Sequence, residues 1–470
     1  MLAWRTIDAR RRCLDFNDKA GYLRCSPQFN TSRPAEEPSM RGARLPVVAT
    51  IWAGSFFLAF DRVNISLAAP GIMHDIVLDG AQMGLVLSMY YWGYTFGNFA
   101  GGLVSPNLRL RGLTSLLILV WAALTAVTGL CDVLWQFCVV RVLFGLAEGA
   151  TANLMHRLQN NWLLPSERGR GYGIFIGFVY LGIALGMPLV GALIKLWDWR
   201  VMFYLSALLT LMLVILFWTM VRDHPWQHPR VPAAEGRDFE DIITRDRASL
   251  AASDVELKLA QRLPALFAIP SFAWLCVASF FVIGVYFTNM SWLPGYLVKE
   301  RGYTVLSSGI YLTIPYLSAF AGMWSAGGIG DRFGNRARVA MVMALMTCPA
   351  VLLLTASENV NATIALMSLM LFCNSAALNG IMVLLFDLVP ASLFGTGVGM
   401  VGGLSGGLSG IIGPWLMGYL YDLTGSFFGG FMTLAGGTLL GAAALWPVAV
   451  YEKQIRDDKL RRLAAAAGAA

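Results

Sequence analysis

Charged side chains are scarce in this chain of 470 residues. Asp, Glu, Lys and Arg together make up 13% of it, and hydrophobic residues make up 57%. An ordinary soluble domain carries about 25% charged residues, so this composition excludes that class. The apolar residues are gathered into runs of 18 or more. Each run is long enough to cross the ~30 Å core of a bilayer as a helix. The predicted fold class is therefore an all-α polytopic membrane protein.

Motifs for metal, nucleotide and covalent chemistry are missing as well. The seven cysteines are scattered without the spacing of metal ligands. The glycine run at 402–410 is not followed by Gly-Lys-Ser or Gly-Lys-Thr, so it does not read as a phosphate-binding loop. The sequence shows no nucleophile–base set either. We expect no cofactor, no metal and no enzymatic activity, and energy for any transport must come from an ion gradient.

Twelve stretches are predicted to span the membrane. They lie near 45–70, 81–104, 112–130, 134–157, 169–194, 199–221, 269–297, 305–328, 338–356, 361–387, 391–421 and 425–450. Lysine and arginine are concentrated in alternate loops and in the tails, and the outer loops carry only Lys195, Arg200, Lys299 and Arg301. This asymmetry is the positive-inside rule, and it predicts an inner (plasma) membrane protein with both termini in the cytoplasm. The net charge of +7 therefore reports topology and does not indicate a nucleic-acid partner.

A long polar interval divides the chain into two halves of six spans. The predicted parts are a cytoplasmic tail at 1–44, a first bundle at 45–221, a linker at 222–268, a second bundle at 269–450 and a tail at 451–470. We expect one amphipathic helix near 247–262 in the linker. Because Met40 precedes a normal start for a membrane helix, our hypothesis is that residues 1–39 are not translated; the alternative is a disordered tail. A 6+6 plan is typical of transporters built from repeated bundles.

A weak internal repeat supports that division. The stretch at 327–336 reads Gly-Gly-Ile-Gly-Asp-Arg-Phe-Gly-Asn-Arg, and the stretch at 101–111 occupies the equivalent place in the first half without the aspartate. A glycine-rich loop with Asp-Arg at these two positions resembles the major facilitator superfamily, which implies two pseudo-symmetric six-helix bundles. In that family the loop latches the halves on the cytoplasmic side. The residues that the resemblance assigns to this latch are Gly327, Asp331, Arg332 and Arg336.

Only two of the 35 lysines and arginines fall inside the long apolar stretches, Arg62 and Arg141. A cation at membrane depth costs roughly 2.5 to 3.5 kcal/mol, so it needs a partner or a task. Arg141 and Glu148 are seven residues apart, which puts them on one helix face about 10 Å apart along the axis. Asp61 and Arg62 are consecutive and point about 100° apart, so Arg62 is predicted to face substrate. The alternative is that these four charges only tie two helices together.

Further motifs resemble the anion:cation symporter family within that superfamily. The matching pieces are 61–70 (Asp-Arg-Val-Asn-Ile-Ser-Leu-Ala-Ala-Pro), 82–84, 92–94, 141–149, Trp162 with Pro165, 167–169, 199–200 and 292–294. Members of that family carry organic anions such as sugar acids, usually with protons. The resemblance implies a substrate contact for Tyr94, with helix packing as the alternative, and proton-carrying roles for Asp61 and Glu148. Arg62 and Arg141 are predicted to form a pair of guanidinium forks that binds an anion near the bilayer midplane. A guanidinium fork matches a carboxylate in two parallel hydrogen bonds, which favours the same reading.

The charge count suggests how protons and anions are coupled. With both acids ionised, Arg62, Arg141, Asp61 and Glu148 sum to zero. A bound carboxylate makes the site negative unless an acid takes up a proton. Burial and a nearby anion both favour the neutral form of a carboxyl group, so Asp61 or Glu148 is expected to protonate as substrate arrives. This predicts proton–anion symport.

Other polar residues in the spans are candidates for the cavity wall. Tyr90 and Asn289 are predicted to contact substrate, and helix packing is the alternative for each. The same choice applies to Tyr91, Trp92, Asn98, Tyr286, Tyr316, Asn374 and Asn379. Where the sugar-acid members carry amide side chains, this chain has 176–179 (Ile-Gly-Phe-Val), Gly403 and Gly407. These replacements favour a less hydroxylated carboxylate, aromatic or short-chain.

The leading hypothesis is a proton-coupled symporter of organic carboxylates that works by alternating access as a monomer. Its predicted partners are a small organic anion, protons and the lipid bilayer. One alternative is an efflux antiporter of weak acids or drugs, although a cationic-drug pump would not carry two arginines in an acidic cavity. Another is a membrane sensor that binds the anion without moving it, although the tails and linker are too short for a sizeable output domain.

Overall fold

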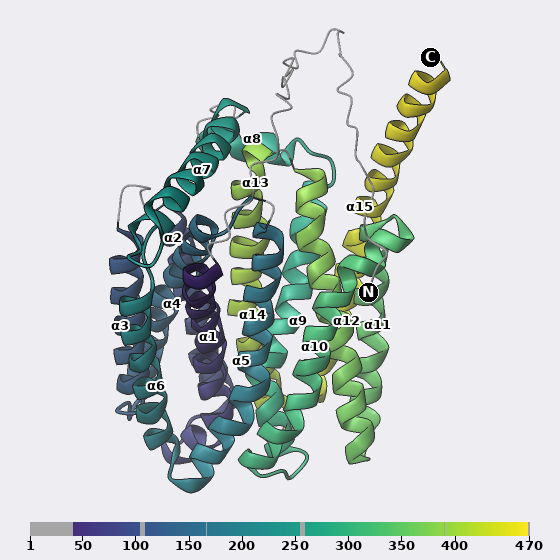
Figure 1. Ribbon diagram of the computed structural model, residues 1–470. Helices are drawn as coiled ribbons and strands as arrows, with labels where there is room; N and C mark the ends of the chain where they lie inside the picture. The colour runs from purple at the N-terminus through teal and green to yellow at the C-terminus, as the bar shows by residue number, and fades with distance from the viewer. Residues whose placement is uncertain (1–40, 104–108, 166, 254–258, 390, 469–470) are drawn as a thin grey trace. The chain divides into compact units, whose positions relative to one another are not determined.

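The computed structural model describes residues 41–103, 109–165, 167–253, 259–389 and 391–468 (Figure 1). The predicted tail at 1–39, with Met40, lies outside the described residues, as does part of the first loop repeat, 104–108. All regular elements of the described part are helices. The first six long helices are α1 (Arg41–Asp75), α2 (Gly80–Leu103), α3 (Leu110–Thr128), α4 (Leu134–Trp162), α5 (Arg168–Leu196) and α6 (Trp199–Met220). We call α1–α6 the first half.

The later long helices are α9 (Phe272–Lys299), α10 (Val305–Phe333), α11 (Arg336–Ala356), α12 (Val360–Leu388), α14 (Gly406–Thr424) and α15 (Phe428–Gly468). We call α9–α15 the second half. A short helix α13 (Ala391–Val398) leads into α14 through a π-helical segment, Gly399–Ser405. This segment holds much of the glycine run, and π-helical turns inside a helix are frequent at functional sites. The predicted span 391–421 is thus a helix with one irregular segment.

Local sequence signals explain where these helices begin and end. Asn335 accepts a hydrogen bond from the Arg338 amide at 2.7 Å at the start of α11, and Asn359 accepts one from the Asn361 amide at 2.9 Å at the start of α12. Asp198 caps α6 in the same manner. Gly334 ends α10 with a φ of 66°, a left-handed conformation that favours glycine.

Eleven helices of the described residues are long and apolar enough to cross a membrane. The long helix outside that set is α2, whose polar residues include Tyr90, Tyr91, Tyr94 and Asn98. It packs along α4 on one side and α14 on the other, both of which are among the eleven. The predicted span at 81–104 is therefore present as α2, a helix that its neighbours shield. Such shielding is how a less apolar segment is accommodated at membrane depth.

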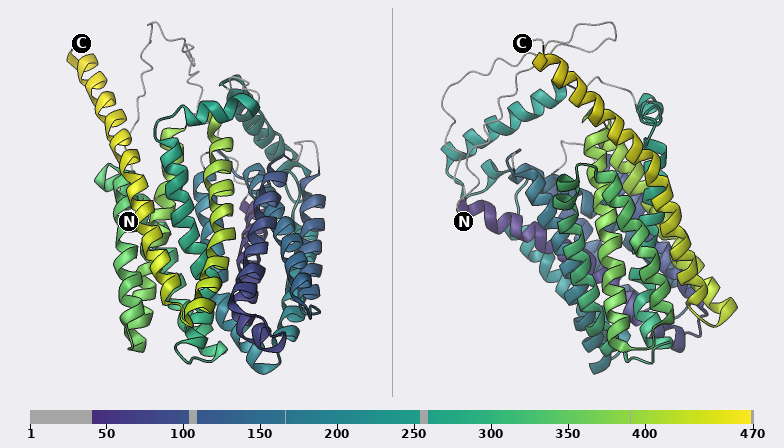
Figure 2. Two further views of the ribbon diagram at one scale, coloured as in Figure 1. Left: turned by 180° about the vertical axis from the view of Figure 1, so that it is seen from behind. Right: turned by 90° about the vertical axis from the view of Figure 1, so that its right-hand side faces the viewer.

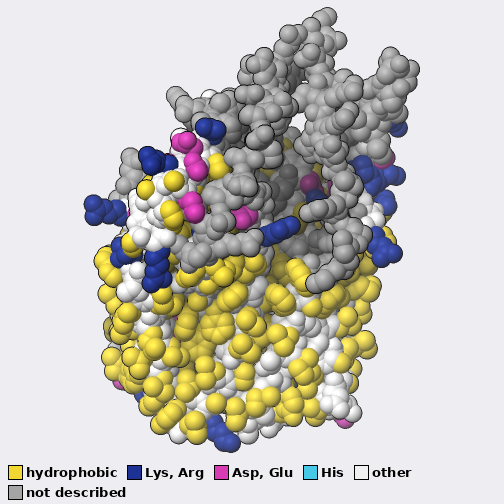
Figure 3. Space-filling view, viewed as in Figure 1, with side chains coloured by type: hydrophobic (Ala, Val, Ile, Leu, Met, Phe, Trp, Pro, Cys, Tyr) yellow, Lys and Arg dark blue, Asp and Glu magenta, His cyan; other side chains and the backbone are white. Residues whose placement is uncertain are grey.

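A wide apolar band covers the face of the molecule drawn in Figure 3, and most of its Lys and Arg side chains gather beyond one edge of that band. The linker helices α7 (Ala233–Ser253) and α8 (Leu259–Phe267) lie at that same end (Figure 1). The prediction of a single linker helix near 247–262 is wrong, because that range includes the end of α7, at Ser253, and the start of α8, at Leu259. Phe239 and Ile243 anchor α7 in a small buried cluster with Leu164, which fixes the helix earlier in the sequence.

The two halves meet mainly along two pairs of helices, α2 with α14 and α5 with α10, and α1 also contacts α9. Figures 1 and 2 show α14 beside α9 and α15 in the second half. The Thr313 hydroxyl donates a hydrogen bond to the Ala184 carbonyl at 3.0 Å, joining α10 to α5. Close approach between α2 and α4 depends on glycine, since a Cβ at Gly145 would lie 2.1 Å from the Tyr90 carbonyl oxygen. This contact positions the residues described next.

Candidate functional site

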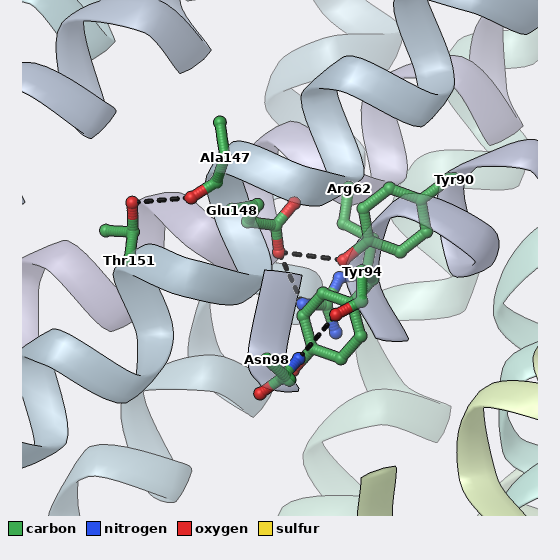
Figure 4. A network of polar contacts seen from close by, with 7 residues as sticks. All are labelled: Arg62, Tyr90, Tyr94, Asn98, Ala147, Glu148 and Thr151. Carbon is green, nitrogen blue, oxygen red and sulfur yellow. Dashed lines mark hydrogen bonds and ion pairs between the residues drawn. The ribbon is translucent and has the colours of Figure 1, made fainter. Parts of the chain in front are cut away.

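A buried ion pair joins Arg62 of α1 to Glu148 of α4 (Figure 4). The Glu148 side chain is fully buried and that of Arg62 is 10% exposed. The Tyr90 hydroxyl of α2 donates a hydrogen bond to the same Glu148 oxygen, Oε1, at 2.9 Å. Three helices therefore meet at one carboxylate oxygen. Among the described residues, neither Glu148 Oε2 nor Arg62 Nε has a hydrogen-bond partner.

Two tyrosine rings hold the Arg62 guanidinium from the side of α2. The guanidinium carbon lies 5.0 Å from the centre of the Tyr94 ring and 5.4 Å from that of Tyr90. The two rings are themselves 5.5 Å apart. A cation over an aromatic face gains most where water is excluded. The rings therefore help to keep the charge of Arg62 at this depth and limit the directions in which it can move.

Asp61 forms a separate buried group with α6. Its Oδ2 accepts a hydrogen bond from the Thr210 hydroxyl at 2.7 Å, and its Oδ1 accepts one from the Asn64 amide at 2.9 Å. Asp61 is 1% exposed. The consecutive residues Asp61 and Arg62 thus address different helices, which agrees with the angle expected from the sequence.

Arg141 lies inside the first half. Its guanidinium carbon is 5.1 Å from the Phe144 ring and 5.8 Å from the Phe203 ring of α6, and the residue is 2% exposed. Within the described part of the chain no ion pair joins Arg141 to an acid. Its ring contacts all belong to α4 and α6. Arg62 and Arg141 therefore have different direct contacts, although both act electrostatically on Glu148, and a shared anion site formed by the two stays a prediction.

The pairing expected from the sequence is corrected by this geometry. Glu148 was expected to be the acidic partner of Arg141, on the same face of one helix. Arg62 was expected to face substrate without an acidic partner. The structure pairs Glu148 with Arg62 instead. Seven residues along one helix leave about 10 Å between two side chains along the axis. A neighbouring helix at close approach brings its residue much nearer.

A group of aromatic and amide residues faces Arg62 from the second half. Tyr286 of α9 lies within electrostatic range of Arg62 and of Tyr94. Its ring is 6.0 Å from that of Tyr180 on α5. Tyr316 of α10 lies in turn near Tyr286. Sequence reasoning missed Tyr180, which is 2% exposed, because no charge or motif marks it.

Asn289 follows Tyr286 by three residues on α9 and is 1% exposed. Neither atom of its amide has a hydrogen-bond partner among the described residues. By contrast, Asn98 and Asn379 serve helix packing: Asn153 donates to Asn98 Oδ1 at 2.9 Å, and Asn379 donates to the Met323 carbonyl at 2.8 Å. Asn289 is thus a buried amide of the second half whose hydrogen-bonding atoms have no partner among the described residues.

The latch residues lie at the end of the molecule that carries α7. Arg336 forms an ion pair with Asp387 of α12 at 2.5 Å, and its backbone amide donates to Glu452 of α15 at 3.0 Å. These contacts join elements of the second half to one another. Arg332 is exposed, and neither the burial of Gly327 nor the side chain of Asp331 is described. A latch between the halves therefore stays a prediction.

Comparisons with known proteins extend these observations. The family model described as Major Facilitator Superfamily matches residues 51–406 and 325–466. The hexuronate transporter of Bacillus subtilis (strain 168) is 28% identical over 415 residues, which covers 85% of this chain and 93% of that protein. A probable sulfoacetate transporter, SauU, of Cupriavidus necator is 29% identical over 411 residues, covering 83% and 90%.

Solved structures show a similar fold. A bacterial homolog of the human lysosomal transporter Spinster, crystallised inward-facing and unoccupied, superposes with a TM-score of 0.68 at 16% identity. The superposition covers 88% of this chain and 96% of that one.

Proposed function

The chain belongs to the Major Facilitator Superfamily, and from that premise we propose that it carries organic carboxylates across the inner (plasma) membrane together with protons. Both termini lie in the cytoplasm in this proposal, as the distribution of lysine and arginine in the loops predicts. Relatives named for a hexuronate and for sulfoacetate align over more than 80% of the chain, and both of those compounds are organic acids. The transport cycle is alternating access, in which the two halves move around a site near the bilayer midplane.

The observation that carries the proposal is the Arg62–Glu148 pair. Arg62 lies near Tyr286 of the second half and already binds a carboxylate, that of Glu148. Its Nε has no hydrogen-bond partner in the described part of the chain, so the guanidinium has further capacity for an anion. A substrate carboxylate offers the same two oxygens as Glu148. Substrate and Glu148 therefore compete for one cation.

This competition provides the coupling to protons. When substrate takes Arg62, Glu148 loses its cation while it stays fully buried. An unpaired buried carboxylate is unfavourable, so Glu148 takes up a proton. The Oε2 atom, which lacks a partner, is where that proton is held. Before substrate enters, the ion pair keeps Glu148 deprotonated, so proton and substrate bind together.

Asp61 and Arg141 have supporting roles in this proposal. Asp61 is the second acid that can take up a proton, because it is 1% exposed and burial disfavours its charged form, while the hydrogen bonds donated by Thr210 and Asn64 favour the ionised form. Arg141 adds positive charge to the site from within the first half and is the second arginine proposed to bind the carboxylate. With both acids ionised the four groups sum to zero, so a carboxylate that enters with one proton leaves the site neutral. Efflux of weak acids by exchange with protons is the alternative, and it would require proton and substrate to bind in turn and not together.

Proteoliposomes of the purified protein provide the test. We expect uptake of a carboxylate identified by a thermal-shift panel to rise with an inward proton gradient. Arg62→Ala should lose ligand-induced stabilisation, while Arg245→Ala, at a side chain that is 84% exposed on α7, should keep it. Ligand stabilisation without uptake would favour a sensor. Uptake indifferent to the proton gradient would reject symport.

A further inference from the structure

The second half contains buried polar atoms that no described residue satisfies. Among them are both amide atoms of Asn289, the hydroxyl of Tyr316 and the side-chain oxygen of Asn374, and the hydroxyls of Ser271 and Thr288 are others. These residues are at most 1% exposed. Nearly all buried polar atoms in proteins have a hydrogen-bond partner, so a group of orphans calls for an explanation. They supply donors and acceptors in a place where a ligand is expected.

These atoms belong to one region opposite Arg62. Asn289 and Tyr286 are three residues apart on α9, which places them on the same side of the helix. Tyr316 lies within electrostatic range of Tyr286, and Tyr286 lies within that range of Arg62. The Asn374 amide donates to the Val282 carbonyl at 3.1 Å, one turn before Tyr286 on the same helix. These residues therefore belong to α9 and to two helices that contact it, and α9 also contacts α1, which carries Arg62.

The same region contains no formal charge. Charged residues of α9–α14 stand only at helix ends, for example Lys299 as the last residue of α9 and Asp422 near the end of α14. In α15 the first charged residue is Glu452. The first half, by contrast, contributes Arg62 with its acid. The site is thus charged on one side and neutral but rich in hydrogen-bonding groups on the other.

We infer that the substrate is a monocarboxylate whose opposite end carries an uncharged hydrogen-bonding group, such as a hydroxyl, a carbonyl or an amide. The carboxylate lies on Arg62, and the neutral end bonds to Asn289 and Tyr316. A second carboxylate or a sulfonate would be buried among amide and phenol groups without a cation, which is strongly unfavourable. This inference rests on the proposed function, and it excludes dianions such as aldaric acids and sulfoacetate as preferred substrates.

Matched pairs of acids test the inference. In each pair, the monoacid carries a hydroxyl or hydroxymethyl group where the diacid carries its second carboxylate. The pairs are galactonate with galactarate, 4-hydroxybutyrate with succinate, and 4-hydroxybenzoate with terephthalate. We expect the monoacid of whichever pair binds to have a dissociation constant at least about tenfold lower than that of its diacid, measured by thermal shift and by uptake into proteoliposomes. A diacid that binds as tightly as its partner, or more tightly, would overturn the inference.

Variants at Asn289 separate this inference from the proposed function. Asn289→Ala should reduce the preference for 4-hydroxybutyrate over butyrate, because a site that bonds a hydroxyl discriminates against the analogue without it. The control is Asn361→Ala, an exposed amide on α12 that should leave the preference unchanged. Asn289→Asp tests the charge of the region and should weaken every monoacid. Melting temperatures without ligand show whether each variant folds.

The outcomes are distinguishable. If diacids bind tightly and Arg62→Lys abolishes their binding, the carboxylate carrier stands and the monoacid inference falls. If no carboxylate binds or enters proteoliposomes, the proposed function itself falls. An unchanged hydroxyl preference in Asn289→Ala would reject the role of the second half.

Discussion

At the scale of single residues, the site depends on the shape of one guanidinium. Arg62 binds the Glu148 carboxylate and lies over two tyrosine rings, and lysine can reproduce the charge but not the planar fork or the stacking. We expect Arg62→Lys to raise the dissociation constant of the carboxylate by at least about 100-fold, roughly 3 kcal/mol. Thermal-shift titration measures this. Arg245→Lys on the exposed face of α7 is the control, and near-normal affinity in Arg62→Lys would contradict a fork.

Glu148 provides a second prediction, which separates coupling from binding. Glu148→Gln keeps the shape of the side chain and a hydrogen-bond acceptor for Tyr90, but it removes the titrating group. We expect proton-driven accumulation to be lost while exchange of substrate across the membrane continues at a rate within a few fold of the wild type. Counterflow and gradient-driven uptake in the same proteoliposomes measure the two activities. Equal loss of both would refute the coupling role, and Glu358→Gln, in an exposed loop, is the control.

Which charged residues lie buried within the first half was predictable from the sequence, because the cost of charge in a membrane singles out Asp61, Arg62, Arg141 and Glu148. Which residue pairs with which was not. The pairing of Glu148 with Arg62 depends on how closely α1, α2 and α4 approach one another. The spacing of residues along one helix does not determine the distance between helices. Tyr180 and the open amide of Asn289 depend likewise on contacts between helices. The helices themselves were predictable because apolar runs, caps and glycines are local signals.

At the scale of elements, the packing of α2 on α4 positions the acid. A Cβ at Gly145 would lie 2.1 Å from the Tyr90 carbonyl oxygen, so Gly145→Ala must push the helices apart. Overpacking of this kind costs about 1–3 kcal/mol. We expect a lower melting temperature and a weaker bond between Tyr90 and Glu148, which should reduce substrate affinity as well.

The matched control for that substitution is Gly112→Ala in α3, where a Cβ would meet nothing within 4 Å. It should leave the melting temperature unchanged or raise it slightly, since alanine favours a helix over glycine. A melting temperature of Gly145→Ala equal to that of Gly112→Ala would show that the close contact does not set the spacing of the two helices.

At the scale of the whole described part of the chain, contacts between the halves include the ends of α2 and α14 remote from α7. There the Asp422 carboxylate of α14 accepts hydrogen bonds from the Gly80 amide at 2.7 Å and the Ala81 amide at 2.5 Å. An anion at a helix N-terminus is favourable because the first amides have no partner within the helix. In the proposed topology this contact closes the outer side, so it favours the state that is open to the cytoplasm.

Asp422→Asn should therefore shift the balance of the cycle away from that state. The residue is exposed, and an anion at a helix N-terminus typically contributes 0.3–1 kcal/mol, so we expect a shift of roughly two- to fivefold. Hydrogen exchange of the amides at 80–82 should speed up by that factor. The amides at the start of α12, which Asn359 caps within the second half, should exchange as in the wild type. Asp132→Asn, an exposed acid paired with Arg200 inside the first half, is the control. If exchange at 80–82 were equal in Asp422→Asn and Asp132→Asn, the Asp422 carboxylate would not hold the start of α2, and the closure of the outer side would have to rest on helix packing alone.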